Sequence, residues 1–226
     1  MINLFNHPWI FNQKISIMRI FLILFLLAAS YSSGVSQEIF NSKPKLIGSC
    51  EGCEAIFEYG EKKLTPADTL VDFNRPGAKL KLTGTIYQND GKTPARDVIL
   101  YIYHTNQNGI YETTGNETGW GKRHGRIRGW IKTDTDGGYN FYTLKPGTYP
   151  SRSEPAHVHP IILEPNGNHY WLGSYYFDDD PLLTQNHRNP DSQRGGSNGI
   201  MILEKENGIW VGRRDITLGK NIPGYE

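Results

Sequence analysis

The sequence predicts an all-β protein, an antiparallel β-sandwich with long loops that carry the functional residues. The 226 residues include 25 Gly, 13 Pro and 13 Tyr, a turn-rich and aromatic-rich set that favours strands over helix bundles. Segments of alternating apolar and polar residues recur between turn signals, and no long window beyond the N-terminal segment has a helical apolar period. Strands are expected at residues 80–87, 98–104, 127–133, 139–144, 158–163, 170–177, 200–203 and 210–216.

The first residues have the layout of a secretory signal peptide. Lys14 and Arg19 form a basic flank, residues 20–29 form a short apolar run, and small residues up to Ser36 form a cleavage zone. The run is about ten residues long, whereas a membrane-spanning helix needs roughly 20. We therefore favour removal of residues 1–36 over a retained membrane anchor, and expect the mature protein to be secreted or periplasmic, with no membrane segment.

Residues 37–79 are expected to form an N-terminal extension to a single domain over residues 80–226. The extension holds both cysteines of the chain, Cys50 and Cys53, in a Cys-x-x-Cys arrangement. Three interpretations are open: a short-loop disulfide, a thioredoxin-like redox pair, and half of a metal site. The disulfide suits an exported chain best, because no βαβ pattern surrounds the pair and no second Cys or His pair follows at zinc spacing.

The charge of the chain is balanced, with 24 Lys and Arg against 23 Asp and Glu and a formal net charge of +1. Nucleic acids and anionic membrane surfaces are usually bound through a concentrated basic field. We therefore expect neither as a partner, whereas a homodimer is compatible with the sequence.

Local signals refine the order of the strands. Residues 98–104 are almost continuously apolar, which predicts a central strand. Residues 134–138, Asp-Thr-Asp-Gly-Gly, predict a hairpin connection between the strands on either side. Two long loops, residues 106–126 and 178–198, interrupt the pattern. Loops of this length in a compact domain are often functional, and the alternative is that they are disordered.

His157-Val-His159 is the sharpest local indication of a metal site. Residues i and i+2 of a strand point to the same face, so both imidazoles can reach one metal. Neutral imidazole suits Fe, Cu, Zn and Ni. The alternative interpretation is a pair of polar residues on a solvated face of the sheet.

A rigid turn places a tyrosine close to this histidine pair. Lys-Pro-Gly-Thr-Tyr-Pro at residues 145–150 and Glu-Pro-Ala at residues 154–156 fix an irregular backbone that would hold Tyr149 at a defined distance. A phenol has an ordinary pKa of about 10, and a trivalent cation can remove its proton. Tyrosinate is a hard oxygen donor that matches ferric iron.

These motifs resemble the intradiol ring-cleavage dioxygenases, the family that contains catechol and protocatechuate dioxygenases. The linked sequences Lys-Pro-Gly-x-Tyr-Pro and Pro-Ala-His-Val-His are highly specific for it. The order and spacing of the matching pieces agree, and the pieces are residues 98–104, 106–111, 125–126, 133–139, 141–150, 155–159 and 176–182.

The resemblance implies a non-haem Fe(III) centre held by Tyr111, Tyr149, His157 and His159, with the two tyrosines as catalytic residues and with Tyr111 released when substrate binds. It also implies that the long loops carry the active site. The implied reaction inserts both atoms of O2 into a small catechol-type aromatic and gives a muconate-type dicarboxylate. No external reductant is needed, which suits an exported enzyme.

Two positions depart from the pattern of the family. Glu154 stands where family members usually carry an arginine, and Ser174 stands where a glutamine is typical. A carboxylate in place of a guanidinium reverses the local charge and removes a five-donor fork. Arg126 is a candidate replacement, together with Arg123 and Arg128, although a solvated strand edge is the alternative interpretation for Arg126 and Arg128.

Two further histidines, His104 and His124, lie near the motifs and are expected not to be ligands.

Two other functions compete with the dioxygenase interpretation. A secreted β-sandwich binding module would keep the metal site without turnover, and the departures at Glu154 and Ser174 favour it. A cupin-like metalloenzyme would use the His-x-His-x4-Glu spacing that ends at Glu164, but no second cupin half follows in the sequence.

Overall fold

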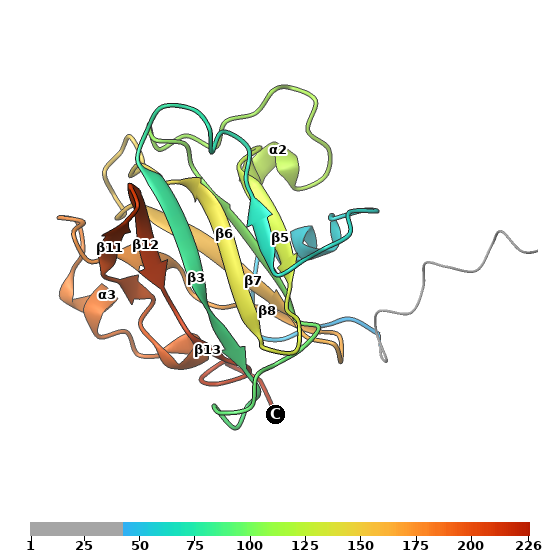
Figure 1. Cartoon of the computed structure of the whole chain (residues 1–226). Helices are drawn as coiled ribbons and strands as arrows, with labels where there is room; N and C mark the ends of the chain where they lie inside the picture. The colour runs from blue at the N-terminus through green and yellow to red at the C-terminus, as the bar shows by residue number, and fades with distance from the viewer. Residues whose placement is uncertain (1–42) are drawn as a thin grey trace, which may run out of the picture. The chain divides into compact units, whose positions relative to one another are not determined.

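A computed structural model describes residues 43–226, which form two β-sheets packed face to face (Figure 1). The expected signal peptide, residues 1–36, lies outside the described residues. Within residues 43–226, no helix combines the length and the apolar character needed to cross a membrane.

The first sheet holds the strand that carries the histidine pair. Its seven strands are β1 (Lys45–Leu46), β4 (Ile99–His104), β5 (Arg128–Lys132), β7 (His157–Leu163), β8 (Asn168–Trp171), β9 (Tyr175–Phe177) and β10 (Ile200–Met201). The main order is β1-β8-β7-β4-β5. Strand β8 pairs with the end of β7, β9 pairs with its first two residues, and β10 pairs with β9.

The second sheet faces the first and contains no histidine of the predicted site. Its six strands are β2 (Ala67–Thr69), β3 (Lys79–Tyr87), β6 (Gly138–Leu144), β11 (Leu203–Glu206), β12 (Ile209–Arg213) and β13 (Ile216–Thr217). The main order is β11-β12-β3-β6-β2, and β13 also pairs with β3. Figure 1 shows β11, β12, β3 and β6 lying in front of β7 and β8.

The main core lies between the two sheets. Along β3, every second residue is buried, and Leu80 and Leu82 pack in one cluster with Ile102 of β4 and Val158 of β7. This period-two burial follows from the pleat of a strand, whose successive side chains point to opposite faces.

Strand β4 is buried on both faces, which explains its continuous apolar sequence. Its second face packs in a separate cluster that contains Tyr101, Trp130 and Ile56. Ile56 belongs to η1 (Cys53–Phe57), a short 3-10 helix that covers the outer face of the first sheet. The expectation of a central strand at residues 98–104 is confirmed.

The sandwich is confirmed, but the expectation of purely antiparallel sheets is wrong. Five strand pairs are parallel, namely β1 with β8, β2 with β6, β9 with β10, and β12 and β13 with β3. All five join strands that are distant in sequence, so no tight turn fixes their direction. Alternation reveals a strand but not the direction of its partner.

The expected hairpin at residues 134–138 is also wrong. Strand β5 pairs with β4 in the first sheet, whereas β6 pairs with β3 in the second. The turn therefore carries the chain from one sheet to the other. Similarly, the strand expected at residues 170–177 is divided into β8 and β9, and Gly173 between them has a φ of 85°.

Residues 43–79 are integrated into the sandwich. Strand β1 extends the first sheet and β2 extends the second. Between them in the sequence, η1 packs on the outer face of the first sheet. Cys50 and Cys53 form a disulfide, with Cα atoms 5.7 Å apart. This cross-link closes the turn that leads into η1.

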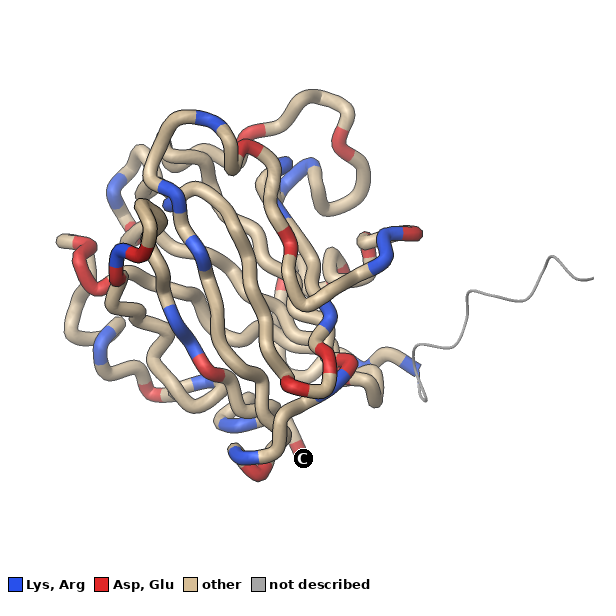
Figure 2. The backbone as a smooth tube through the Cα atoms, viewed as in Figure 1, with Lys and Arg blue, Asp and Glu red and all other residues tan. Residues whose placement is uncertain are grey.

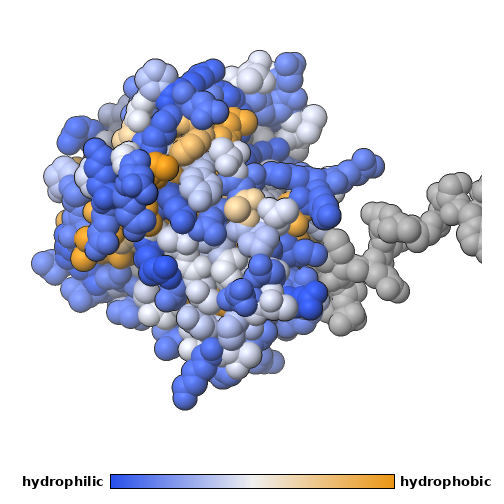
Figure 3. All heavy atoms as spheres, viewed as in Figure 1, coloured by the Kyte–Doolittle hydropathy of each residue, from blue (hydrophilic) through white to orange (hydrophobic). Residues whose placement is uncertain are grey.

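The two long loops contain short helices. Residues 106–126 include α2 (Gly121–His124), and residues 178–198 include α3 (Gln185–Arg188) and the 3-10 turn η2 (Arg194–Gly196). Basic and acidic residues are interspersed along the chain, in keeping with the balanced charge (Figure 2). On the face shown in Figure 3, hydrophobic residues form separate patches in a largely hydrophilic surface. The expected homodimer stays a prediction.

Candidate metal centre

The histidine pair lies at the start of β7, in the middle of the first sheet. His157 and His159 occupy the same face of the strand, and their Nε2 atoms are 2.9 Å apart. The Nδ1 atom of His157 is 2.7 Å from the carbonyl oxygen of Pro155. When Nδ1–H donates to this carbonyl, the lone pair of Nε2 faces His159, which is the tautomer that a metal ligand requires.

Tyr111 and Tyr149 come from two loops that meet through glycines. A Cβ atom added to Gly109 would lie 1.9 Å from the carbonyl oxygen of Thr148, and one added to Gly147 would lie 2.2 Å from that of Gln107. Only glycine allows the two backbones to approach so closely. The glycine of each motif thus sets the position of the tyrosine that follows it.

The four side chains close a ring of donor atoms. Tyr111 Oη is 2.9 Å from Tyr149 Oη and 2.9 Å from His159 Nε2. Tyr149 Oη is 3.2 Å from His157 Nε2, which completes the ring. The structure therefore brings together all four residues that the sequence nominated, two phenol oxygens and two imidazole nitrogens directed at one another.

Burial keeps the imidazoles in the state that binds metals. It lowers the pKa of His157 and lowers the pKa of His159 well below its ordinary value, so both rings are neutral at neutral pH. Burial also raises the pKa of Tyr111, and its hydrogen bond with Tyr149 acts in the same direction. A metal cation would reverse this effect, because it is the largest local charge in such a site.

The donor set points to a hard metal. Among residues 43–226, no group of three or more His, Cys, Asp or Glu side chains could hold a metal ion. The capacity of the ring to bind a metal therefore depends on its tyrosine oxygens. Two anionic oxygen donors with two neutral nitrogen donors fit ferric iron, and the residues present are thus compatible with the group that the resemblance implies.

Tyr103 supports the ring from behind and was not anticipated from the sequence. It lies opposite His159 in the β4–β7 register, and the two rings stack with centroids 4.5 Å apart. Tyr103 also stacks on His124, with ring centroids 3.7 Å apart. The pairing of β4 with β7, rather than any local motif, creates this contact.

The expected non-ligands have other partners. His104 is buried, with Nδ1 2.7 Å from the carbonyl oxygen of Thr105 and Nε2 2.9 Å from Thr143 Oγ1. His124 Nδ1 is 2.9 Å from the hydroxyl of Tyr101. Neither imidazole contributes to the donor ring.

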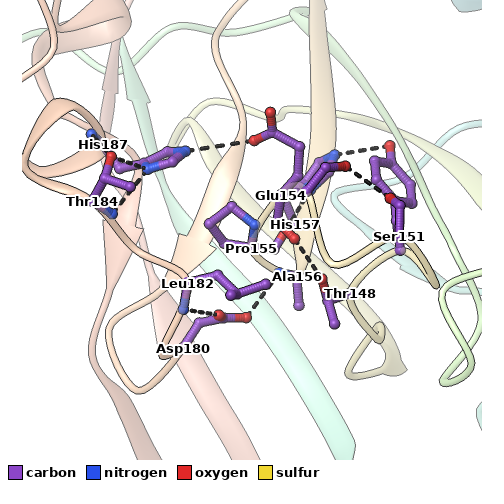
Figure 4. A network of polar contacts seen from close by, with 12 residues as sticks. Thr148, Ser151, Glu154, Pro155, Ala156, His157, Asp180, Leu182, Thr184 and His187 are labelled. Atoms are coloured by element: carbon purple, nitrogen blue, oxygen red, sulfur yellow. Dashed lines mark hydrogen bonds and ion pairs between the residues drawn. The ribbon is translucent and has the colours of Figure 1, made fainter.

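Glu154 lies beside the centre rather than in it. Its side chain is 49% exposed, and its carboxylate is 3.6 Å from His187 Nε2 (Figure 4). His187 belongs to α3 and also contacts Thr184 through Nδ1, at 2.8 Å. The same close view shows Asp180 accepting hydrogen bonds from the backbone N–H groups of Ala156 and Leu182, which fixes the segment before the histidines.

The other nominated residues have defined surroundings. Ser174 is buried just before β9 and lines a small cavity with Tyr176. Arg126 forms ion pairs with Asp72 and, at 3.5 Å, with Glu112. The two other arginines suggested as replacements are likewise paired, Arg123 with Glu51 and Arg128 with Glu58.

Comparisons with known proteins agree with this arrangement. A family model described as "Dioxygenase" matches residues 57–194. The beta chain of protocatechuate 3,4-dioxygenase from Burkholderia cepacia is 30% identical over 150 residues, which are 55% of this chain and 58% of that relative. The match therefore spans less than two thirds of the length of that relative.

Solved structures share the fold. The dioxygenase domain of a dioxygenase carbohydrate-binding fusion from Streptomyces sp. SirexAA-E matches with a TM-score of 0.53 and 22% identity, over 79% of this chain and 98% of that one. An intradiol ring-cleavage dioxygenase from Tetranychus urticae matches with a TM-score of 0.52 and 20% identity, over 74% and 90%. Catechol 1,2-dioxygenase from Acinetobacter sp. ADP1 matches with a TM-score of 0.51 and 17% identity, over 85% and 65%.

The family match covers more than half of the chain and includes both tyrosines and both histidines of the donor ring. The protein is therefore a member of the intradiol ring-cleavage dioxygenase family.

Proposed function

We propose that the protein is an exported non-haem Fe(III) dioxygenase that inserts both atoms of O2 into a catechol-type aromatic and releases a muconate-type dicarboxylate. The observation that carries the proposal is the closed ring of donor atoms from Tyr111, Tyr149, His157 and His159, with neighbouring donors 2.9 to 3.2 Å apart. Membership of the family supports an oxidoreductase of the dioxygenase class.

The residues of the ring would hold the iron, and their own neighbours would hold them. Bound ferric iron would serve as a Lewis acid and as a template for the catechol and dioxygen. The carbonyl of Pro155 fixes the tautomer of His157, and the ring of Tyr103 fixes the plane of His159.

Tyr111 is the ring member suited to handle a proton. Its Oη is within hydrogen-bond distance of both Tyr149 Oη and His159 Nε2. Burial raises the pKa of Tyr111, so a phenol that did not serve as a ligand would hold its proton firmly. A catechol hydroxyl that loses its proton on binding would thus deliver it to Tyr111 Oη.

The cupin-like alternative finds no support. Glu164 follows the far end of β7 from His157, and its carboxylate accepts hydrogen bonds from Tyr170 at 2.7 Å and from Tyr225 at 2.9 Å. Its position therefore lies outside the donor ring.

Oxygen consumption by the iron-loaded protein tests the proposal. The protein would be incubated with catechol, protocatechuate and substituted catechols under isotopically labelled dioxygen. The masses of the products would be determined by mass spectrometry. We expect both labelled atoms in an acyclic dicarboxylate. Tyr149→Phe should abolish the reaction, whereas Tyr142→Phe, on the outer face of β6, should leave it unchanged.

Iron-loaded protein that consumes no oxygen with any catechol would contradict catalysis. If such a protein still bound catechols at the metal, the non-catalytic binding module would be favoured. Incorporation of a single labelled atom would contradict intradiol cleavage in particular.

A further inference from the structure

A second candidate binding site lies beside the metal centre, in a cavity of about 210 Å³. The cavity is bounded by the segment that joins β8 to β9 and by the loop that contains α3 and η2. The side chains that matter for its chemistry are those of Trp171, Ser174, Tyr176, His187, Arg194 and Arg214. Two of them are arginines, and none of the described residues that line the cavity is Asp or Glu.

Arg214 is a buried cation without a carboxylate partner among residues 43–226. The residue is 4% exposed, and its guanidinium donates to backbone carbonyl oxygens, including those of Gly173 at 3.1 Å and Leu172 at 3.2 Å. Its Nε is the only buried side-chain nitrogen or oxygen in the described part of the chain with no hydrogen-bond partner. Carbonyl dipoles offset part of the cost of burying this charge but leave it unneutralised.

Arg194 is held in place by an aromatic face. Its guanidinium lies 4.7 Å from the ring centroid of Trp171, and Nη1 donates to the carbonyl oxygen of the same residue at 3.2 Å. Its own carbonyl oxygen accepts a hydrogen bond from Arg214 at 2.8 Å, so the two arginines belong to one assembly. Within the described residues this guanidinium has no ion pair, which leaves further N–H groups for a ligand.

The charged groups around the cavity do not neutralise it. Asp178 pairs with Arg188 at 2.6 Å, and Glu154 faces His187 from outside the lining. Arg214 is buried and Arg194 is half-buried, and this burial lowers the pKa of both guanidinium groups. An anion that entered the cavity would recover electrostatic free energy that the protein itself does not supply.

We propose that this cavity binds a small organic carboxylate with a flat carbon skeleton. The arginines provide the charge that a carboxylate requires, and Trp171, Leu172 and Tyr176 contribute apolar surface to the lining. The inference does not depend on iron or on turnover.

The cavity adjoins the metal centre through one side chain. The ring centroid of Tyr176 is 5.9 Å from that of His157 and 5.0 Å from that of His187. If the protein is the dioxygenase proposed above, its dicarboxylate product belongs to the class of ligand that this cavity fits.

Calorimetric titration of the full purified chain, metal-free and iron-loaded, tests the proposal with benzoate and cis,cis-muconate as probes. We expect at least one probe to bind in both forms. Arg194→Gln should weaken binding about tenfold or more, because it removes the more accessible charge of the pair. Asn186→Asp, which adds a carboxylate to the exposed side of the lining, should weaken it similarly.

The matched control is Arg213→Gln. Arg213 is adjacent in sequence to Arg214, but its side chain is 67% exposed and pairs with Asp215 at 3.7 Å, so binding should be unchanged. Preference for muconate would identify a product site, and preference for benzoate would identify a site for aromatic acids. Absence of binding for both probes, or binding that Arg194→Gln leaves unaltered, would overturn the proposal. The metal-free protein cannot turn over substrate, so this outcome is independent of the proposed activity.

Discussion

Tyr103 and His159 face each other across the β4–β7 pair, with ring centroids 4.5 Å apart and planes inclined by 13°. The phenol ring thus fixes the orientation of an imidazole whose Nε2 belongs to the donor ring. Because a side chain that orients a ligand commonly changes metal affinity by about 10-fold or more, we expect Tyr103→Leu to weaken iron binding by about that factor.

Tyr103→Phe is the control for this substitution, since it keeps the stacked ring and removes only the hydroxyl. Its iron affinity, measured by competition with a chelator, should match that of the wild type. Equal affinity in Tyr103→Leu would show that the stack does not position His159.

Because the two tyrosine loops approach closely, we expect a single added methyl group to lower the unfolding free energy substantially. In Gly109→Ala, the Cβ would lie 1.9 Å from the carbonyl oxygen of Thr148, so the loops must separate. Gly115→Ala, in the same loop, has a similar positive φ but meets no atom within 4 Å. We expect the control to lose about 1 kcal/mol of unfolding free energy from backbone strain, and Gly109→Ala to lose roughly 2 kcal/mol more from the clash. Equal losses in urea denaturation would contradict the account.

Asp180 is expected to stabilise the segment before the histidines. Its carboxylate accepts from the N–H of Ala156 at 2.8 Å and from the N–H of Leu182 at 2.9 Å. Asp180→Ala should therefore reduce the unfolding free energy by about 2–4 kcal/mol. Its neighbour Asp179 is 67% exposed and pairs with Lys145, so Asp179→Ala should cost less than about 1 kcal/mol. The interpretation fails if the two variants are equally stable.

We expect the folded protein to lose stability in mild acid because of the buried His104. Burial lowers the pKa of His104 from 6.5 to about 4 in the folded protein. Between these values the unfolded chain binds the proton more readily, so stability is fully present above pH 6.5 and falls as the pH approaches 4. The shift corresponds to roughly 3 kcal/mol.

Urea denaturation across this pH range measures the effect. In His104→Gln the decline should be smaller than in the wild type by roughly that amount, even if the variant is less stable overall. Tyr142→Phe, on the outer face of β6, leaves every histidine in place, serves as the control and should follow the wild type. A decline in His104→Gln as steep as in the wild type would assign the acid sensitivity to other groups.

The sequence predicted the metal-site residues better than the topology. Tyr149, His157 and His159 lie within one rigid stretch, so strand geometry and turn chemistry are enough to bring them together. Tyr111 required the resemblance, because its contact with Tyr149 arises from the approach of Gly109 to Thr148 across two loops. Nothing local indicates such an approach.

Features that depend on remote pairing were not predictable. The parallel strands, the change of sheet at residues 134–138 and the stack of Tyr103 on His159 all depend on which strands become neighbours. The cavity beside Tyr176 combines residues from three segments, among them Arg194 and Arg214. Each arginine alone resembles an ordinary surface cation in the sequence, and only the fold shows that neither has an acidic partner in the described residues.

The visible absorption spectrum of the iron-loaded protein tests the central claim most directly. If Tyr111 and Tyr149 hold ferric iron, the protein should have a strong visible charge-transfer band that is weakened or shifted in Tyr111→Phe and in Tyr149→Phe, but unchanged in Tyr142→Phe. A colourless protein that contains one ferric ion per chain, or a band that both ring variants leave unaltered, would contradict the account.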